Sequence, residues 1–261
     1  MAETAVFTGR DGRFVASELA RGPWNPDAQH GGAPAALLMR AFERCEGGDA
    51  LAMARVTYEF LRPVPLDEVE VRASVTQSHR RVQWLEGSLL DGSGIELVRA
   101  RALRVTPADA GGVTSGESAP PPGPERGVPD QLPPPHGLPM FAPNAIGIRF
   151  VAGGFGGGPS TAWFRLRHPL VAGEQPSPLQ RLAAAGDFGN GISAVLSWDE
   201  YLFINPDLTL YIDREPVGEW ICLQSQTALA PDGMGTAESV LFDERGRIGR
   251  AVQALLVARR R

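Results

Sequence analysis

Apolar and polar residues alternate along two long stretches of the chain, and each stretch also holds a segment of helical periodicity. In the first stretch the alternation predicts strands near residues 13–19, 52–61, 68–79, 82–91 and 95–105. The second stretch predicts strands near residues 148–152, 161–166, 207–213, 219–229, 235–243 and 248–258. Helices are predicted from about Ala33 to Cys45 and from Ser177 to about Leu196. The pattern predicts an α+β fold with two antiparallel sheets, each wrapped around a central helix.

The two stretches also match each other in sequence at an offset of 152 residues. Without gaps, nine of the 49 positions between 57 and 105 are identical to their counterparts between 209 and 257. Thr57 aligns with Thr209, and the segments Asp91–Gly94 and Asp243–Gly246 align as two hairpin turns, because Asp and Gly tolerate the backbone angles of such turns. These matches predict a duplicated fold.

Proline and glycine are concentrated between the two stretches. Residues 106–145 hold eleven of the 23 prolines and six of the 31 glycines. Proline lacks an N–H donor and fixes its φ angle, so this segment is typical of an extended linker. We therefore predict an N-terminal domain over residues 1–105, a linker over 106–145 and a C-terminal domain over 146–261.

Composition and charge exclude several classes of protein. The 25 basic and 30 acidic residues give a net charge of −5, which argues against a nucleic-acid partner. No apolar run approaches the roughly 20 residues of a membrane span, and the first residues lack the apolar core of a secretion signal. Cys45 and Cys222 stand far apart, which argues against a disulfide scaffold or a zinc site. We expect a cytoplasmic protein without a metal or a cofactor.

Seven short motifs carry a resemblance to a known family: Trp24-Asn25-Pro26, His30-Gly31-Gly32, Phe60-Leu61-Arg62-Pro63-Val64-Pro65, Ala185-Gly186-Asp187-Phe188, Asn205-Pro206-Asp207-Leu208-Thr209, Gly218-Glu219-Trp220 and Val252-Gln253-Ala254. In their order and spacing the chain resembles the double-hotdog acyl-CoA thioesterases of the thioesterase II type. The resemblance implies a double-hotdog fold and an acyl-CoA substrate that is hydrolysed to a free acid and coenzyme A. It also implies a role in fatty acid metabolism.

The resemblance further implies three catalytic positions. The family places an Asp at the start of the second-half helix, a Thr before the next strand and a Gln on the last strand. Here the matching residues are Asp187 and Gln253, while Asn205 stands where the family has Thr. Asn both donates and accepts hydrogen bonds, and Thr209, four residues further on, is the fallback.

The chemistry of these residue types fits the hydrolysis of a thioester. Asp187 could deprotonate or orient a water molecule, with Gln253 and Asn205 fixing that water. Backbone N–H groups at the helix start could receive the oxyanion. Structural roles stay open beside these: Asp187 bordering a helix, Gln253 facing solvent, and Asn205 forming a turn before Pro206.

Substrate-binding candidates lie in the first half. His30 precedes Gly31 and Gly32 at a helix start, where backbone N–H groups could bind an anion or an acyl carbonyl. The alternative for His30 is a cap that packs in an interface. Trp24 is expected to pack against the same helix, and lining an acyl pocket is its alternative role.

Two other functions stay open. A non-catalytic acyl-CoA-binding protein would explain Asn205 in place of Thr. An enoyl-thioester hydratase on the same fold would pair a carboxylate with a histidine, although the second half offers no histidine beside Asp187. The basic cluster His79-Arg80-Arg81 is expected to be solvated, with contact to coenzyme A phosphates as the alternative. Exposed sheet edges permit a homo-oligomer.

Overall fold

A computed structural model describes residues 4–47, 51–112, 119–129 and 137–260. Within these ranges the first half of the chain supplies the following strands: β1 (Phe7–Arg10), β2 (Arg13–Ala16), β3 (Ala52–Phe60), β4 (Glu68–Ser78), β5 (Val82–Asp91) and β6 (Glu96–Val105). The remaining strands are β7 (Val128–Pro129), β8 (Ile146–Ala152), β9 (Ser160–Leu166), β10 (Tyr201–Ile204), β11 (Asp207–Ile212), β12 (Trp220–Leu229), β13 (Met234–Asp243) and β14 (Gly246–Arg259).

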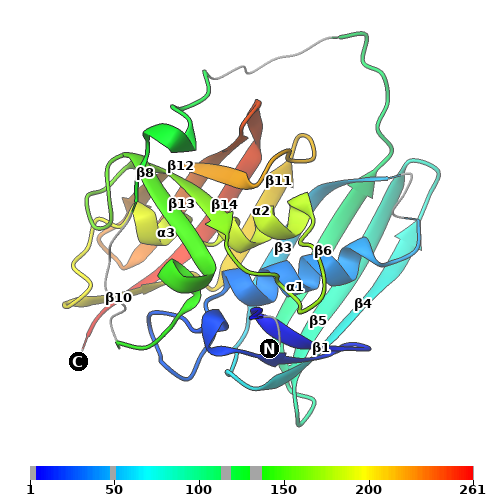
Figure 1. The fold of residues 1–261 in the computed structure, drawn as a ribbon, viewed down its shortest axis with the longest axis horizontal. Coiled ribbons are helices and arrows are strands. Elements are labelled where there is room, and N and C mark those ends of the chain that lie inside the picture. The colour runs from blue at the N-terminus through cyan, green and yellow to red at the C-terminus, as the bar shows by residue number, and fades with distance from the viewer. Residues whose placement is uncertain (1–3, 48–50, 113–118, 130–136, 261) are drawn as a thin grey trace.

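These strands form one continuous sheet, in which the two predicted sheets are joined edge to edge. The described strands follow the order β1-β2-β4-β5-β6-β3-β11-β14-β13-β12-β9-β8-β7, with β10 paired to β14. The halves meet where β3 pairs with β11 in antiparallel register. On each side of this seam the same strand order runs outward, so the duplication in the sequence is also a duplication in the sheet (Figure 1).

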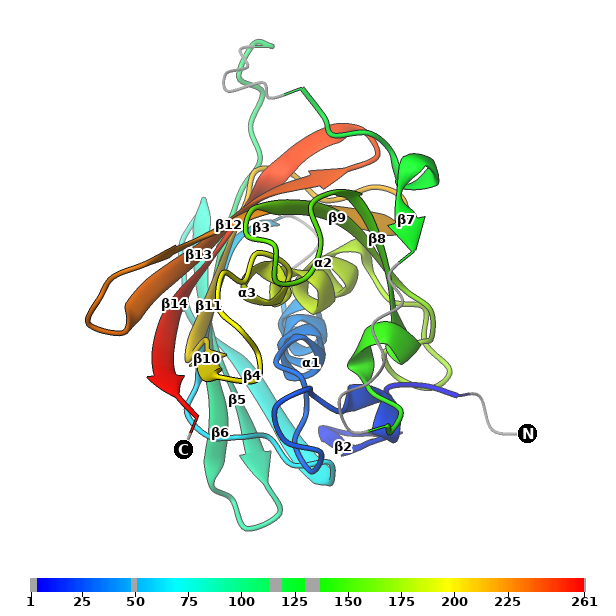
Figure 2. The ribbon, with the colours of Figure 1, turned by 90° about the vertical axis from the view of Figure 1, so that its left-hand side faces the viewer.

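The helices lie on the inner face of the curved sheet (Figure 2). Helix α1 (Gly32–Glu43) packs against β4 and β5, and α2 (Pro178–Gly186) packs against β12 and β9. The two helices also pack against each other, because the first turn of α1 consists of small residues. A Cβ atom on Gly32 would lie 2.5 Å from the carbonyl oxygen of Ala184, so only glycine permits this approach. The main hydrophobic core therefore includes residues from both halves.

The second predicted helix is shorter than the sequence suggested. Ser177 caps its start as expected, with its hydroxyl accepting from the N–H of Gln180. The helix ends at Gly186, however, and a single turn α3 (Gly189–Ile192) follows. Glycines at 186, 189 and 191 lower helix stability, and Asp187, the C-cap, accepts hydrogen bonds from Asn205 and Gln253 far along the chain.

The ends of the first half and the linker also differ in detail from the prediction. The strand predicted over residues 13–19 ends at Ala16, where Ser17 caps the 3-10 turn Glu18–Ala20. Parts of the predicted linker lie on the second half: β7 pairs with β8, and the indole of Trp163 donates to the carbonyl of Pro122. Residues 113–118 and 130–136 of the linker lie outside the described residues, and the domain boundaries at 105 and 146 stay predictions.

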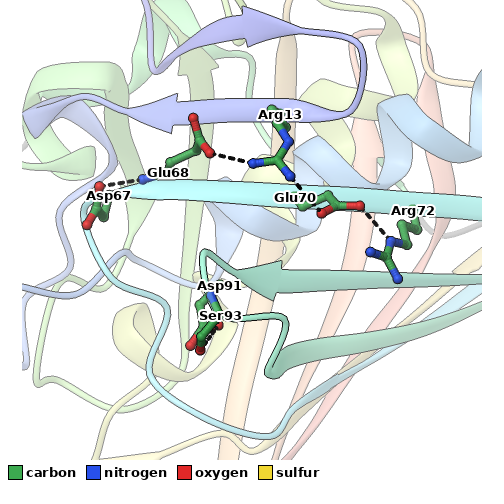
Figure 3. Close-up of polar contacts among 7 residues, drawn as sticks. All are labelled: Arg13, Asp67, Glu68, Glu70, Arg72, Asp91 and Ser93. Atoms are coloured by element: carbon green, nitrogen blue, oxygen red, sulfur yellow. Dashed lines mark hydrogen bonds and ion pairs between the residues drawn. The ribbon is translucent and has the colours of Figure 1, made fainter.

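Alternation in β4 places charged residues on the outer face of the first half. Figure 3 shows Arg13 of β2 contacting Glu68 of β4, and Arg72 contacting Glu70. The predicted turn after β5 is also formed, because the Asp91 carboxylate accepts from the N–H and the hydroxyl of Ser93. The polar face therefore stays on the solvent side while the opposite face covers α1.

Candidate active site

Asp187 lies where α2 ends, in the interior of the molecule. It is the C-cap of α2, and its side chain is 6% exposed. Its Oδ1 atom accepts a hydrogen bond from Asn205 Nδ2 at 2.8 Å and one from Gln253 Nε2 at 3.2 Å. The three residues that the family resemblance implied are thus in direct contact, and Asp187 lies between the end of α2 and the start of α3 at Gly189.

Gln253 belongs to the buried face of β14 and not to the solvent face. It is 1% exposed, whereas its neighbour Ala254 is exposed. Its Nε2 donates both to the carboxylate and to the backbone carbonyl of Asp187, and its Oε1 accepts from the N–H of Asn190 at 2.9 Å. Gln253 therefore ties the segment after α2 to the sheet and leaves Asp187 little freedom to turn.

Asn205 lies in the short connection between β10 and β11. Its Nδ2 group donates to the Asp187 carboxylate and to the carbonyl of Asp207, the latter at 3.1 Å. Thr209 does not join this network, because its hydroxyl donates to Thr57 across the seam. Of the two candidates for the third position, the geometry favours Asn205.

His30 reaches the same carboxylate from the first half of the chain. Its Nδ1 atom lies 3.2 Å from Asp187 Oδ2, and the N–H of Gly32 donates to that nitrogen at 3.0 Å. The imidazole stacks on the ring of Phe188, with centroids 4.4 Å apart. A Cβ atom on Gly31 would lie 2.7 Å from Asp187 Oδ2, so glycine at this position keeps the carboxylate at the start of α1.

Burial shifts both titrating groups toward their neutral forms. It raises the pKa of Asp187 from 3.8 to about 7, against the opposing effect of hydrogen bonds from Asn205, the Gly32 N–H and Gln253. It lowers the pKa of His30 from 6.5 to about 3. Between these two pKa values the pair therefore holds one proton, on the carboxyl group, and it is not an ion pair.

Trp24 packs among aromatic rings. Its ring stacks on Trp198 with centroids 4.4 Å apart and meets Phe203 edge-on at 5.1 Å, while its packing against α1 stays a prediction. No described contact joins Trp24 to Asp187. Phe203 of β10 connects Trp24 to Asn190, because its ring meets Trp24 and its carbonyl accepts a hydrogen bond from the side chain of Asn190.

The structure adds Asn190, a residue that the sequence motifs did not single out. Asn190 is buried and borders a closed apolar cleft, with no free volume for a water molecule, that includes Ala194, Val195, Phe203 and Leu255. Among the described residues its Oδ1 atom has no hydrogen-bond partner. Asn190 connects the cleft to the polar network, because its N–H donates to Gln253. Asn190 is identified by its position in the fold and not by a sequence motif.

The part of the chain that the structure describes contains no group of three or more His, Cys, Asp or Glu side chains placed to hold a metal ion. It also contains no helix that is long and apolar enough to cross a membrane. The network around Asp187 consists of one carboxylate, one imidazole and two amides. Such a set can orient a water molecule and take up its proton.

Comparison with protein families gives matches to both halves. Residues 20–105 match an acyl-CoA thioesterase N-terminal domain, and residues 117–257 match an acyl-CoA thioesterase C-terminal domain. These two ranges contain every member of the network around Asp187. A comparison with curated proteins finds no match.

Solved structures share the fold at low sequence identity. A hotdog-fold protein of unknown function from Alicyclobacillus acidocaldarius has a TM-score of 0.72 at 14% identity, covering 98% of this chain and 96% of its own. An acyl-CoA thioesterase II from Mycobacterium marinum has a TM-score of 0.65 at 15% identity, covering 95% and 92%. The tesB protein of Mycobacterium avium subsp. paratuberculosis has a TM-score of 0.67 at 14% identity, covering 94% and 93%. The fold is therefore that of the hotdog proteins.

Proposed function

This chain belongs to the acyl-CoA thioesterase family and is a thioester hydrolase, and we propose that it hydrolyses an acyl-CoA with water activated by Asp187. The observation that carries the proposal is the contact of Asp187 with Asn205, Gln253 and His30, which come from three separate segments of the chain. A buried carboxylate with a pKa of about 7 is matched to accepting a proton near neutral pH.

In the proposed reaction Asp187 accepts a proton from water while the water oxygen attacks the thioester carbon. The tetrahedral intermediate then collapses, the C–S bond breaks, and the thiolate of coenzyme A takes the proton back from Asp187. Positioned proton transfer of this kind contributes about 10²–10⁴-fold in rate. The carboxylate returns to its starting state, and no metal or cofactor takes part in any step.

The oxyanion of the intermediate requires hydrogen-bond donors, and the start of α1 provides one. The backbone N–H group of Gly31 lies at the positive end of the helix dipole, next to Asp187, whereas the N–H of Gly32 already donates to His30 Nδ1. The N-terminal domain over 1–105 would thus contribute an oxyanion donor and His30, and the C-terminal domain over 146–261 the water-activating group. His30 acts as a positioning residue whose Nδ1 atom can accept a hydrogen bond from Asp187 Oδ2 when that carboxyl group is protonated.

Asn205 and Gln253 orient the carboxylate and the water. Both donate to Asp187 Oδ1, which fixes the plane of the carboxyl group and lowers its pKa against the effect of burial. Removing either donor should therefore impair catalysis even though Asp187 is still present. Trp24 is proposed to border the acyl chain.

The test is thiol release from a panel of acyl-CoAs by the wild type, Asp187→Asn and Gln253→Ala. We expect turnover of at least one acyl-CoA by the wild type and a loss of kcat of about 10²-fold or more in Asp187→Asn. Thr209→Val is the matched control, since Thr209 lies outside the network. No turnover by the wild type, or equal turnover by Asp187→Asn, would contradict the proposal.

The contact between His30 and Asp187 also meets the residue requirement of an enoyl-thioester hydratase. The lowered pKa of His30 keeps the imidazole neutral near pH 7, so in this alternative His30 would serve as the base and not as the acid. Loss of enoyl absorbance with crotonyl-CoA would reveal hydration.

Binding of a non-hydrolysable acyl-CoA without turnover of the true thioester would indicate a non-catalytic binder. Cytoplasmic location, fatty acid metabolism and a homo-oligomer stay predictions of the sequence.

A further inference from the structure

A second concave site lies on the outer face of the sheet, opposite the core. Residues Gly147, Arg165 and Trp220 are lateral partners across β8, β9 and β12, so their side chains share one face. Arg149 lies on β8, two residues after Gly147. Arg167 lies two residues after Arg165, just beyond the end of β9. Alternation places both side chains on that same face. With Arg165 and Trp220 they line a cavity of about 180 Å³, which we call the arginine pocket.

The geometry of the arginine pocket holds its guanidinium groups in place. The guanidinium carbons of Arg165 and Arg149 lie 5.0 and 5.5 Å from the Trp220 ring centroid, within the range of cation–π attraction. Arg149 also donates to the carbonyl of Pro124 at 3.0 Å. A Cβ atom on Gly147 would lie 2.7 Å from Arg167 Nε, so the glycine leaves the space that Arg167 occupies.

The arginine pocket carries positive charge that its surroundings do not neutralise. Arg165 faces Glu219 at 3.7 Å, and both side chains are largely in solvent. Within the described ranges, no carboxylate lies at ion-pair distance from Arg149 or Arg167. The chain as a whole has a net charge of −5, so this local excess of about two charges is not a general property of the surface.

We propose that the arginine pocket binds the phosphate groups of a phosphorylated ligand, at a site separate from the Asp187 network. Guanidinium groups form paired, charge-assisted hydrogen bonds with phosphate oxygens, and the charge of a phosphate dianion matches the local excess. The cavity is several times the roughly 30 Å³ that one water molecule occupies, so it has room for a phosphate group. The phosphate could belong to the nucleotide end of a coenzyme A thioester or to an unrelated ligand.

The test is calorimetric titration of the full chain with pyrophosphate and with adenosine 3′,5′-bisphosphate in a phosphate-free buffer. We expect binding to the wild type and about tenfold weaker binding to Arg167→Gln and to Arg149→Gln. Arg250→Gln is the matched control, because Arg250 is an exposed arginine on β14 outside the pocket. Binding of neither ligand to the wild type, or equal binding to all variants, would overturn the proposal.

A second variant separates specific binding from damage to the fold. Glu219→Gln removes the carboxylate that competes for Arg165, so we expect tighter binding of both ligands, which a destabilised protein would not give. Weaker or unchanged binding in this variant would contradict the charge argument.

Inhibition kinetics then identify the source of the phosphate. Competition of adenosine 3′,5′-bisphosphate with acyl-CoA, relieved in Arg167→Gln, assigns the pocket to the substrate's nucleotide end. Binding without any effect on hydrolysis assigns it to a separate ligand. The titrations need no thioester turnover, so their outcome is independent of the proposed hydrolysis.

Discussion

The hydroxyl of Thr209 donates a hydrogen bond to the hydroxyl of Thr57, its counterpart 152 residues earlier in the chain, at an oxygen–oxygen distance of 3.1 Å. The two residues are also cross-strand partners where β3 meets β11. Equivalent residues of a duplicated chain can pair with each other only at the local two-fold axis that relates the halves. The seam between the halves is therefore centred on this pair.

This pair should contribute measurably to stability. Thr→Val substitution keeps the shape and removes the hydroxyl, so a double-mutant cycle with Thr57→Val and Thr209→Val isolates the hydrogen bond. We expect a coupling free energy of about 0.5–1.5 kcal/mol in denaturant unfolding. The same variants should keep their thioesterase activity, and additive effects on the free energy of unfolding would show that the hydroxyls do not cooperate.

Sequence reasoning predicted the repeated meanders because their signals are local. Alternation marks the strands, and Asp91 and Asp243 mark the turns that the structure forms with their carboxylates. Sequence reasoning failed where contacts between distant segments determine the structure. The pairing of β3 with β11 leaves no local signature, and four-residue strands such as β1 and β10 are too short to show a period.

The candidate site was likewise predicted from the sequence only in part. The family motifs pointed to Asp187, Gln253 and Asn205, and the chain brings the three together. They did not indicate that Asp187 ends α2, where the backbone carbonyl of Asp187 accepts a hydrogen bond from Gln253, 66 residues away. The stacking of Trp24 on Trp198 joins opposite halves and could not be read from either segment.

The rate of hydrolysis should follow the ionisation of Asp187. The carboxylate must be unprotonated to accept a proton, and burial raises its pKa to about 7. We therefore expect kcat/KM to rise about tenfold per pH unit at low pH and to level off above about pH 7. The measurement is a pH–rate profile with one acyl-CoA, and a profile that levels off near pH 4 would place the base elsewhere.

Replacing Gln253 should shift that profile. Gln253→Glu exchanges an amide donor for a second carboxylate next to Asp187, and a like charge disfavours ionisation. We expect the rising limb of kcat/KM to move to higher pH. Gln253→Ala is the comparison variant: it also removes the donor but adds no charge, so its limb should move less. An unchanged limb in Gln253→Glu would argue against contact between these groups in solution.

Titration of the His30–Asp187 pair should have almost no effect on the free energy of unfolding of the wild type. Between about pH 4 and 6.5 the unfolded pair holds one proton on His30, and the folded pair holds one proton on Asp187. Folding thus takes up no net proton at this pair, and its stability contribution does not depend on pH in that window.

Single substitutions should uncover the two opposing effects. In His30→Asn the remaining raised pKa of Asp187 means that the folded state binds more protons, so the free energy of unfolding should fall as pH rises from about 4 to 7. In Asp187→Asn the lowered pKa of His30 means that the unfolded state binds more protons, so stability should rise between about pH 3 and 6.5. Denaturant unfolding across pH measures both slopes, and equal slopes in the two variants would contradict the coupling.

Asn205 offers the sharpest test of how this chain departs from the family pattern. Its amide donates to Asp187 and also to the carbonyl of Asp207, so it fixes both the carboxylate and the start of β11. Asn205→Thr restores the family residue and keeps one donor, whereas Asn205→Ala removes both hydrogen bonds. We expect Asn205→Thr to retain kcat within about tenfold and Asn205→Ala to lose about 10- to 100-fold, since a hydrogen bond to a charged group contributes about 1.5–3 kcal/mol. Thr209→Val serves as the control for this region. Greater loss in Thr209→Val than in Asn205→Ala would transfer the third position to Thr209, against the geometry of the network.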